Sequence, residues 1–219
     1  YSACPSVADW ERAFGEDDDV LAFTITSGLS GSFRAACAAK LNCEENSPSR
    51  RICIIDSLST GPEIVLLIEK AVSELSAGAD FDAVCRSVQD YQRRTHLIFA
   101  LESLHNLAQN GRVGKLAAAA AGMLGIRAVG TTSDEGTLDL LGKCRGRKRA
   151  VDFLQEEMER LGYTGGCVRI GHCRNTDSAG ELRTAILHRF PGANIRIYPL
   201  RGLCSYYAEC GGVLVGFEA

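Results

Sequence analysis

The stretch Thr24-Ile-Thr-Ser-Gly-Leu-Ser-Gly-Ser-Phe-Arg-Ala-Ala36 decides the fold of this chain. It follows the apolar run Val20–Phe23 and leads into Arg34–Leu41, which is rich in good helix formers. This order predicts a strand, a Ser/Thr/Gly turn and a helix. Such a turn directs backbone N–H groups and hydroxyls to one point at the positive end of the helix dipole. An anion can bind there without a cationic side chain.

The serines of this turn allow a simpler interpretation. Serine is common at the start of helices, so Ser30 or Ser32 taken alone is expected only to cap the helix. The anion-binding interpretation therefore depends on the rest of the chain.

Composition narrows the classes of protein to consider. The 219 residues carry a formal net charge of −3, with 46% hydrophobic and 23% charged residues, as in ordinary globular proteins. The one basic cluster, Arg145–Arg149, is too short to indicate nucleic-acid binding. No apolar run is long enough to span a membrane, so integral membrane association is not expected.

The ten cysteines form no C-x-x-C pair and no zinc-binding pattern with histidine, so no metal site is predicted. Cys37, Cys53 and Cys167 lie in apolar runs, where a free thiol behaves as a small hydrophobic group. We expect reduced thiols and a cytoplasmic location.

The first half of the chain alternates strands and helices. Strands are expected at Val20–Thr26, Arg51–Asp56 and His96–Leu101, and all three are continuous apolar runs, which predicts a parallel sheet covered on both faces. Such sheets bind ligands at the carboxyl ends of their strands, where the turns Ser27–Ser32 and Asp56–Thr60 lie. Helices are expected at Val7–Phe14, Gly31–Asn42, Pro62–Ser76 and from Asp80 or Asp82 to Arg93.

The second half has a different character. Lys115–Leu124 is Ala-rich and predicts a close-packed helix, and a hairpin is expected from Ile126–Thr132 and Thr137–Leu141. Further helices are expected at Arg147–Leu161 and Ser178–Arg189, and further strands at Cys167–His172, Asn194–Tyr198 and Val213–Phe217. The predicted fold is α/β with two lobes: a parallel three-layer α/β/α lobe over residues 1–108 and a smaller mixed-sheet lobe over residues 109–219.

A serine hydrolase is one candidate function. Gly28-Leu-Ser-Gly31 falls one position short of the G-x-S-x-G nucleophile elbow. Ser27 or Ser30 could act as the nucleophile with His172, at the end of a strand, as the base. A hydrogen-bonded structural histidine explains His172 equally well. A nucleotide site has less support, because no G-x-G-x-x-G and no Walker lysine is present.

Two further polar groups stand out. Arg112, between Gly111 and Gly114 at the expected lobe junction, could contact an anion or hold the interface, although a solvated turn is the simpler interpretation. Tyr206 and Tyr207 could line a pocket or belong to the core.

Taken together, these motifs resemble the DegV family of bacterial fatty-acid-binding proteins. The resemblance spans essentially all 219 residues, with six motifs in the family's order. They are Ser2-Ala-Cys-Pro-Ser6 (T-S-x-P-S), Ile25–Phe33 (S-S-x-L-S-G-T-Y), Ile54-Ile-Asp-Ser57 with Gly61 (V-I-D-S and a glycine), Leu101-Glu-Ser-Leu with Asn110-Gly-Arg-Val (L-x-x-L…G-G-R-I), Leu124–Val129 (L-L-x-I-K-P-I) and Lys143–Ala150 (K-x-R-x-x-K-K-A).

The resemblance implies a long-chain fatty acid in a tunnel between the lobes, with no other cofactor. Its carboxylate is implied to lie at Ser30, Gly31 and Ser32, where the family has Ser-Gly-Thr, with help from polar side chains such as Ser27, Ser2 and Tyr207. Family members that are fatty acid kinase subunits supply no catalysis. They present the carboxylate to a separate ATP-dependent kinase.

The chain departs from the family pattern in three places. The threonine of T-S-x-P falls on Tyr1, and H-T-G-P-G falls on Tyr207-Ala-Glu-Cys-Gly211, so tyrosine replaces a head-group histidine. A phenol can donate one hydrogen bond to a carboxylate, but it stays neutral at pH 7. The family also has a strand-containing segment before T-S-x-P, so the first lobe is expected to lack its first strand here.

Overall fold

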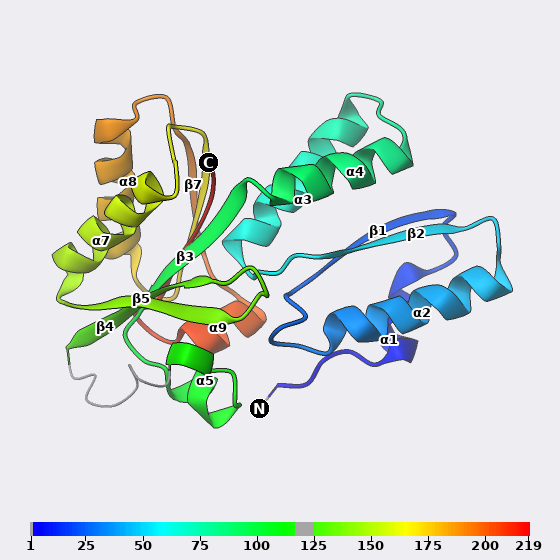
Figure 1. The fold of residues 1–219 in the computed structure, drawn as a ribbon, viewed down its shortest axis with the longest axis horizontal. Helices are drawn as coiled ribbons and strands as arrows, with labels where there is room; N and C mark the ends of the chain where they lie inside the picture. The colour runs from blue at the N-terminus through cyan, green and yellow to red at the C-terminus, as the bar shows by residue number, and fades with distance from the viewer. Residues whose placement is uncertain (1, 117–124) are drawn as a thin grey trace.

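The computed structural model describes residues 2–116 and 125–219 (Figure 1). In chain order the elements of the first half are α1 (Val7–Phe14), β1 (Asp19–Thr24), α2 (Ser32–Asn46), β2 (Arg51–Asp56), α3 (Pro62–Ser76), α4 (Phe81–Gln92), β3 (Thr95–Leu101) and α5 (His105–Gln109). They continue with the 3₁₀ turn η1 (Gly114–Leu116), β4 (Ile126–Thr132), β5 (Leu138–Arg145), α7 (Arg147–Arg160), β6 (Cys167–His172), α8 (Thr176–Arg189), β7 (Asn194–Pro199), α9 (Gly202–Ala208) and β8 (Val213–Glu218).

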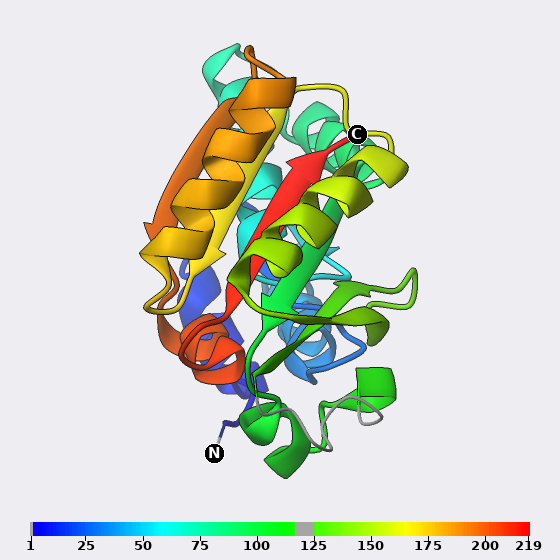
Figure 2. The same ribbon diagram turned by 90° about the vertical axis from the view of Figure 1, so that its left-hand side faces the viewer.

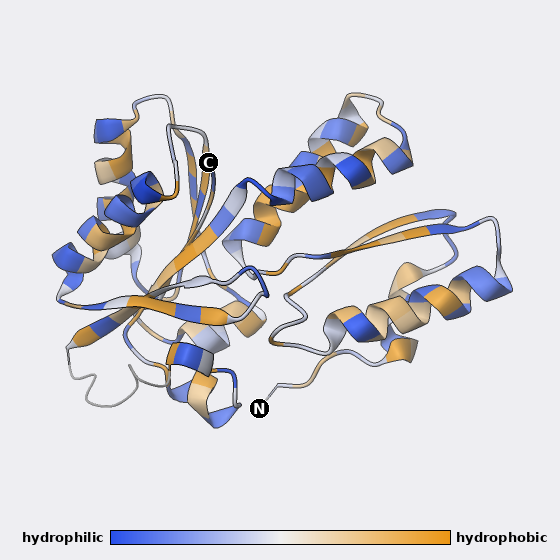
Figure 3. Ribbon diagram, in the orientation of Figure 1, coloured by the Kyte–Doolittle hydropathy of each residue, from blue (hydrophilic) through white to orange (hydrophobic). Residues whose placement is uncertain are grey.

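The first lobe is a three-layer α/β/α arrangement. Strands β1 and β2 run parallel, with Val20 opposite Ile52 and Thr24 opposite Asp56. Helices α1 and α2 bury one face of this pair around Phe14. Helices α3 and α4 bury the other face. Apolar residues run along both strands (Figure 3), as expected for a sheet covered on both sides.

The second sheet has six strands in the order β5-β4-β3-β8-β6-β7, and only β6 and β7 are parallel neighbours. Helices α7 and α8 pack against one face (Figure 2). The other face carries Leu97, Phe99 and Leu101 of β3 and packs against α5 and α9. The predicted mixed sheet with helices is thus confirmed.

Strand β3 corrects one prediction. It was expected to be the third strand of the parallel sheet, but it pairs antiparallel with β8 and with β4 in the six-stranded sheet. The second sheet is therefore the larger one, contrary to expectation. Continuous apolar strands look alike in sequence, so their pairing depends on which edge tertiary packing offers. The boundary at residue 108 stays a prediction.

Local sequence signals explain the confirmed elements. Ser6 forms a capping box with Asp9, its Oγ accepting the Asp9 amide at 3.2 Å. Pro62 lies at the start of α3, and Asp80 caps α4. The predicted hairpin is β4 and β5, although β5 extends to Arg145. Of the predicted helix at Lys115–Leu124, residues 117–124 lie outside the described residues, as does Tyr1.

Helix α3 joins the two lobes. Its first turn lies so close to β8 that a Cβ on Gly216 would sit 2.5 Å from the Glu63 amide nitrogen. Further along, Glu69 accepts hydrogen bonds from Arg169 of β6 at 2.5 and 2.8 Å, and the Arg169 side chain is 3% exposed. A backbone contact and a buried ion pair therefore fix α3 to the second sheet.

Glu63 makes protein stability depend on pH. It is 4% exposed, and burial raises the pKa of its carboxyl group. Between the ordinary glutamate value near pH 4.3 and this raised pKa, the folded protein binds more protons than the unfolded chain. The free energy of unfolding should therefore fall as pH rises through that window. We expect Glu63→Gln to flatten this fall, as measured by urea unfolding across the pH range. The exposed Glu16→Gln variant is the control. If the free energy of unfolding depends on pH in the same way in the wild type and in Glu63→Gln, the prediction is contradicted.

Candidate functional site

The turn after β1 has the geometry that its sequence predicts. The Thr26 amide donates to the Ser59 carbonyl at 2.8 Å, which ties the turn to the one that follows β2. Ser30 Oγ accepts a hydrogen bond from the Ser32 amide at 3.1 Å. Gly31, which lies between these two residues, is the N-cap of α2. Ser30 thus supports the start of the helix, and its position also brings it to the wall of a cavity.

The turn is packed against the second lobe. Thr26 Oγ1 donates to the Gly136 carbonyl at 2.8 Å, at the tip of the β4–β5 hairpin. A Cβ on Gly28 would lie 2.8 Å from the carbonyl oxygens of Glu135 and Gly136, so only glycine allows this approach. The lobes therefore meet at the turn.

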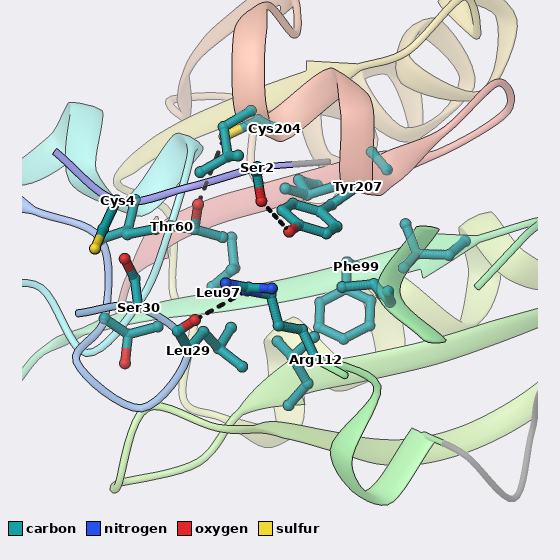
Figure 4. Close-up of a pocket in the computed structure, with 18 of the residues that line it drawn as sticks. Ser2, Cys4, Leu29, Ser30, Thr60, Leu97, Phe99, Arg112, Cys204 and Tyr207 are labelled. Carbon is teal, nitrogen blue, oxygen red and sulfur yellow. Dashed lines mark hydrogen bonds between the residues drawn. The ribbon is translucent and has the colours of Figure 1, made fainter. Parts of the chain in front are cut away.

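A largely apolar cavity lies beside this junction (Figure 4). The space between its atoms amounts to about 780 Å³ with its open mouth included. The N-terminal segment Ser2–Cys4 and helix α9 form part of the wall. The buried apolar wall includes Leu97, Phe99, Leu101, Leu107, Leu138 and Leu214.

Polar groups from distant parts of the chain reach this cavity. Ser2 Oγ and the Tyr207 hydroxyl are 2.5 Å apart, so the N-terminal segment is fastened to α9. Arg112 donates from Nε to the Leu29 carbonyl at 3.1 Å, and its guanidinium carbon lies 5.8 Å from the centre of the Tyr207 ring. Among the described residues, no carboxylate lies within ion-pair distance of Arg112, so its positive charge faces an apolar cavity beside Ser30.

The predicted head-group residues divide into two sets. Ser30, Ser2, Tyr207 and Arg112 line the cavity. Gly31 lies next to it, because a Cβ there would be 3.3 Å from Cys4 Sγ, and Cys4 is in the wall.

Two predicted residues, Ser27 and Ser32, are not part of the cavity wall. Ser32 is 7% exposed, and its amide bonds to Ser30. The Ser27 amide donates to Asp56 Oδ1 at 3.0 Å. Neither Ser27 nor Ser32 is in the cavity wall, so both shape the turn instead.

The structure does not assemble the hydrolase alternative. His172 is 7% exposed, and its Nδ1 accepts the Asn175 amide at 3.3 Å, just before α8. His172 is not in the cavity wall, and no hydrogen bond joins it to Ser27 or Ser30 in the described part of the chain. This geometry supports the structural interpretation of His172.

Sequence reasoning missed several residues of the wall, among them Thr60 and Cys204. Thr60 Oγ1 and Cys204 Sγ are 3.5 Å apart, and both line the cavity. The position of Thr60 in the turn after β2 was a usable signal, because ligands bind at the carboxyl ends of parallel strands. Cys204 gave no signal, since only the folding of α9 brings it there.

Within residues 2–116 and 125–219, no three His, Cys, Asp or Glu side chains are grouped so as to hold a metal ion. Over the same residues no helix combines the length and apolar character needed to cross a bilayer.

Comparison with known families identifies the family of this chain. Residues 1–218 match the profile of the DegV family, described as uncharacterised proteins. The chain belongs to the DegV family. A DegV domain-containing protein from Streptococcus gordonii is 42% identical over 217 residues, which cover 99% of this chain and 77% of the relative.

Two solved structures are similar to this chain throughout. A DegV family protein from Eubacterium eligens, loaded with heptadecanoic acid, matches with a TM-score of 0.95 and 41% identity, covering 100% of this chain and 79% of that one. The fatty acid kinase B3 protein of Streptococcus pneumoniae, loaded with linoleic acid, matches with a TM-score of 0.95 and 42% identity, covering 99% and 77%.

Proposed function

We propose that this DegV protein binds one long-chain fatty acid, with the acyl chain in the apolar cavity and the carboxylate at the Ser30 turn. The observation that carries the proposal is the cavity itself, in which six buried leucine and phenylalanine side chains adjoin one cluster of polar groups. The similar proteins from E. eligens and S. pneumoniae, which were crystallised with fatty acids, support the same ligand class.

The apolar wall provides most of the affinity. Each buried CH₂ group of a ligand contributes about 0.8 kcal/mol on leaving water. A chain of a dozen or more such groups therefore dominates binding, and the polar cluster mainly orients the ligand.

The polar cluster recognises the carboxylate. Ser30, with Gly31 at the helix start, offers donors at the positive end of the α2 dipole. The paired hydroxyls of Ser2 and Tyr207 provide a further donor, with tyrosine in place of the family's histidine.

Arg112 adds a full positive charge to this polar cluster, whose other groups are neutral. We expect Arg112→Met to weaken palmitate binding about tenfold and to leave binding of the uncharged hexadecanol nearly unchanged, because only the carboxylate pairs with the guanidinium. Competition with a fluorescent fatty acid probe measures both affinities. An equal loss for the acid and the alcohol would mean that Arg112 holds only the interface.

Ser30 is the residue of the turn expected to matter most for the head group. Ser30→Ala removes one hydroxyl and should weaken palmitate binding about tenfold. Ser205→Ala is the matched control, because Ser205 Oγ donates to the Gly202 carbonyl within α9 and Ser205 is not in the cavity wall. If the two variants bind palmitate with equal affinity, the carboxylate binds elsewhere than at Ser30.

Ligand extraction tests the proposal directly. The purified protein should release a fatty acid on denaturation, identified by mass spectrometry, and the delipidated protein should rebind palmitate. No released lipid together with no binding of palmitate would overturn the proposal. Labelling of Ser27 or Ser30 by a fluorophosphonate probe would favour a hydrolase instead.

We also infer that the bound acid is presented to a separate ATP-dependent fatty acid kinase in the cytoplasm, and that this chain supplies no catalytic group. The similarity to the fatty acid kinase B3 protein of S. pneumoniae supports this partner. Acyl phosphate should form only when the loaded protein, a kinase of this type and ATP are combined.

A further inference from the structure

Helix α4 runs alongside strand β2 in the first lobe. At one end of the two elements, the guanidinium carbon of Arg51 lies 4.9 Å from the centre of the Phe81 ring. At the other end, Gln92 Nε2 donates a hydrogen bond to the Asp56 carbonyl at 2.9 Å. The strand and the helix therefore begin together and end together.

These two contacts place Cys53 opposite Cys85. Cys53 lies two residues after Arg51, about 7 Å along the strand, and points to the same face because strand side chains alternate. Cys85 lies four residues after Phe81, about 6 Å along the helix and on the same side of it. Cys53 packs against the apolar cluster on this face of the sheet, and the two thiols share a hydrogen bond. Side chains that point toward each other in this way meet a condition for a disulfide.

The two thiols differ in their surroundings. Cys85 is 8% exposed, whereas Cys53 is half-buried. Burial, followed by the hydrogen bond and the charge of Cys53, raises the pKa of the Cys85 thiol to about 12. Cys85 therefore keeps its proton and donates the hydrogen bond. Both thiols are free, and neither residue lines the fatty-acid cavity, so this pair is independent of fatty-acid binding.

We propose that Cys53 and Cys85 form a redox-active pair that a hydroperoxide oxidises to a disulfide. Cys53, the more accessible sulfur, loses its proton and attacks one oxygen of hydrogen peroxide. An S–O bond forms, the O–O bond breaks, and the oxygen that leaves takes up a proton and is released as water. Cys53 is then a sulfenic acid.

Cys85 completes the reaction. Its sulfur attacks the sulfur of the Cys53 sulfenic acid, so that the S–S bond forms and the S–O bond breaks. The hydroxyl group leaves with the proton of Cys85 as a second water. The two thiols together lose two electrons, and the peroxide is reduced to water.

The disulfide joins α4 to β2 covalently. It closes a loop of about 30 residues that contains α3, and such a link restricts the unfolded chain. Oxidation should therefore raise the midpoint of thermal unfolding by about 5–10 °C.

Peptide mapping of the peroxide-treated protein tests the pair directly. Trypsin cleaves after Arg51, Lys70 and Arg86, so each of the two cysteines lies alone in its own peptide. Free thiols are first blocked with iodoacetamide, and the peptides are then analysed by mass spectrometry with and without a reductant. We expect a link between the Cys53 and Cys85 peptides that reduction removes. If both stay free thiols, or if either pairs with another cysteine, the proposal is wrong.

Three variants separate this pair from general oxidation. In Cys85→Ala the sulfenic acid of Cys53 has no partner, so it should persist and react with dimedone. In Cys53→Ser the peptide of Cys85 should stay reduced. Cys43→Ser removes a half-buried thiol on the opposite face of the sheet and should form the disulfide as the wild type does. An equal rise of the thermal midpoint in the wild type, Cys53→Ser and Cys85→Ala would contradict the assignment.

Discussion

Glu69→Ala is expected to lower the free energy of unfolding by about 3 kcal/mol, because it leaves the buried Arg169 guanidinium without its carboxylate. Arg169 keeps hydrogen bonds to the carbonyls of Val168 and Asn194, but these do not neutralise its charge. We place the loss at the lower end of the range for buried pairs because Glu69 is 32% exposed. Urea denaturation followed by circular dichroism measures it.

Arg196→Ala is the matched control for this prediction. Arg196 pairs with the same carboxylate at 3.1 Å, but its side chain is 67% exposed, so its removal should cost less than about 1 kcal/mol. Replacing both partners, as in Glu69→Leu with Arg169→Met, should recover much of the loss because no charge then stays buried. If Glu69→Ala is as stable as Arg196→Ala, the ion pair does not hold α3 to the second sheet.

Leu97→Trp is expected to weaken fatty-acid binding about a hundredfold. Leu97 is 1% exposed and lies in the cavity wall, so an indole there fills space that the acyl chain needs. Displacing three to four CH₂ groups at about 0.8 kcal/mol each accounts for a loss of this size. Displacement of a fluorescent fatty acid measures the affinity.

The substitution will also strain the core, with a cost of about 1–3 kcal/mol, so thermal unfolding must show that the variant stays folded. Leu41→Trp is the control, since Leu41 is 61% exposed on α2 and lies outside the cavity wall. Unchanged palmitate affinity in a folded Leu97→Trp variant would mean that the acyl chain does not occupy this cavity.

Much of the fold could be predicted because its signals are local. The capping box at Ser6 and Pro62 at the start of α3 act through groups within a few residues, and both helices begin where predicted. The same holds for the turn at Ser30, where a strand, small polar residues and a helix follow one another directly.

What the sequence by itself determined is therefore most of the elements and the family, whereas the short helices α5 and α9 were not expected. That the Ser30 turn binds an anion stays a prediction. The tertiary structure decided which sheet receives β3, because its partner β8 lies more than a hundred residues later and an apolar strand can pair at either edge. The tertiary structure also decided which polar side chains lie near Ser30 in the cavity. Ser2, Arg112 and Tyr207 come from distant parts of the chain, and only packing of the two lobes brings their hydrogen bonds and the guanidinium charge to one cavity.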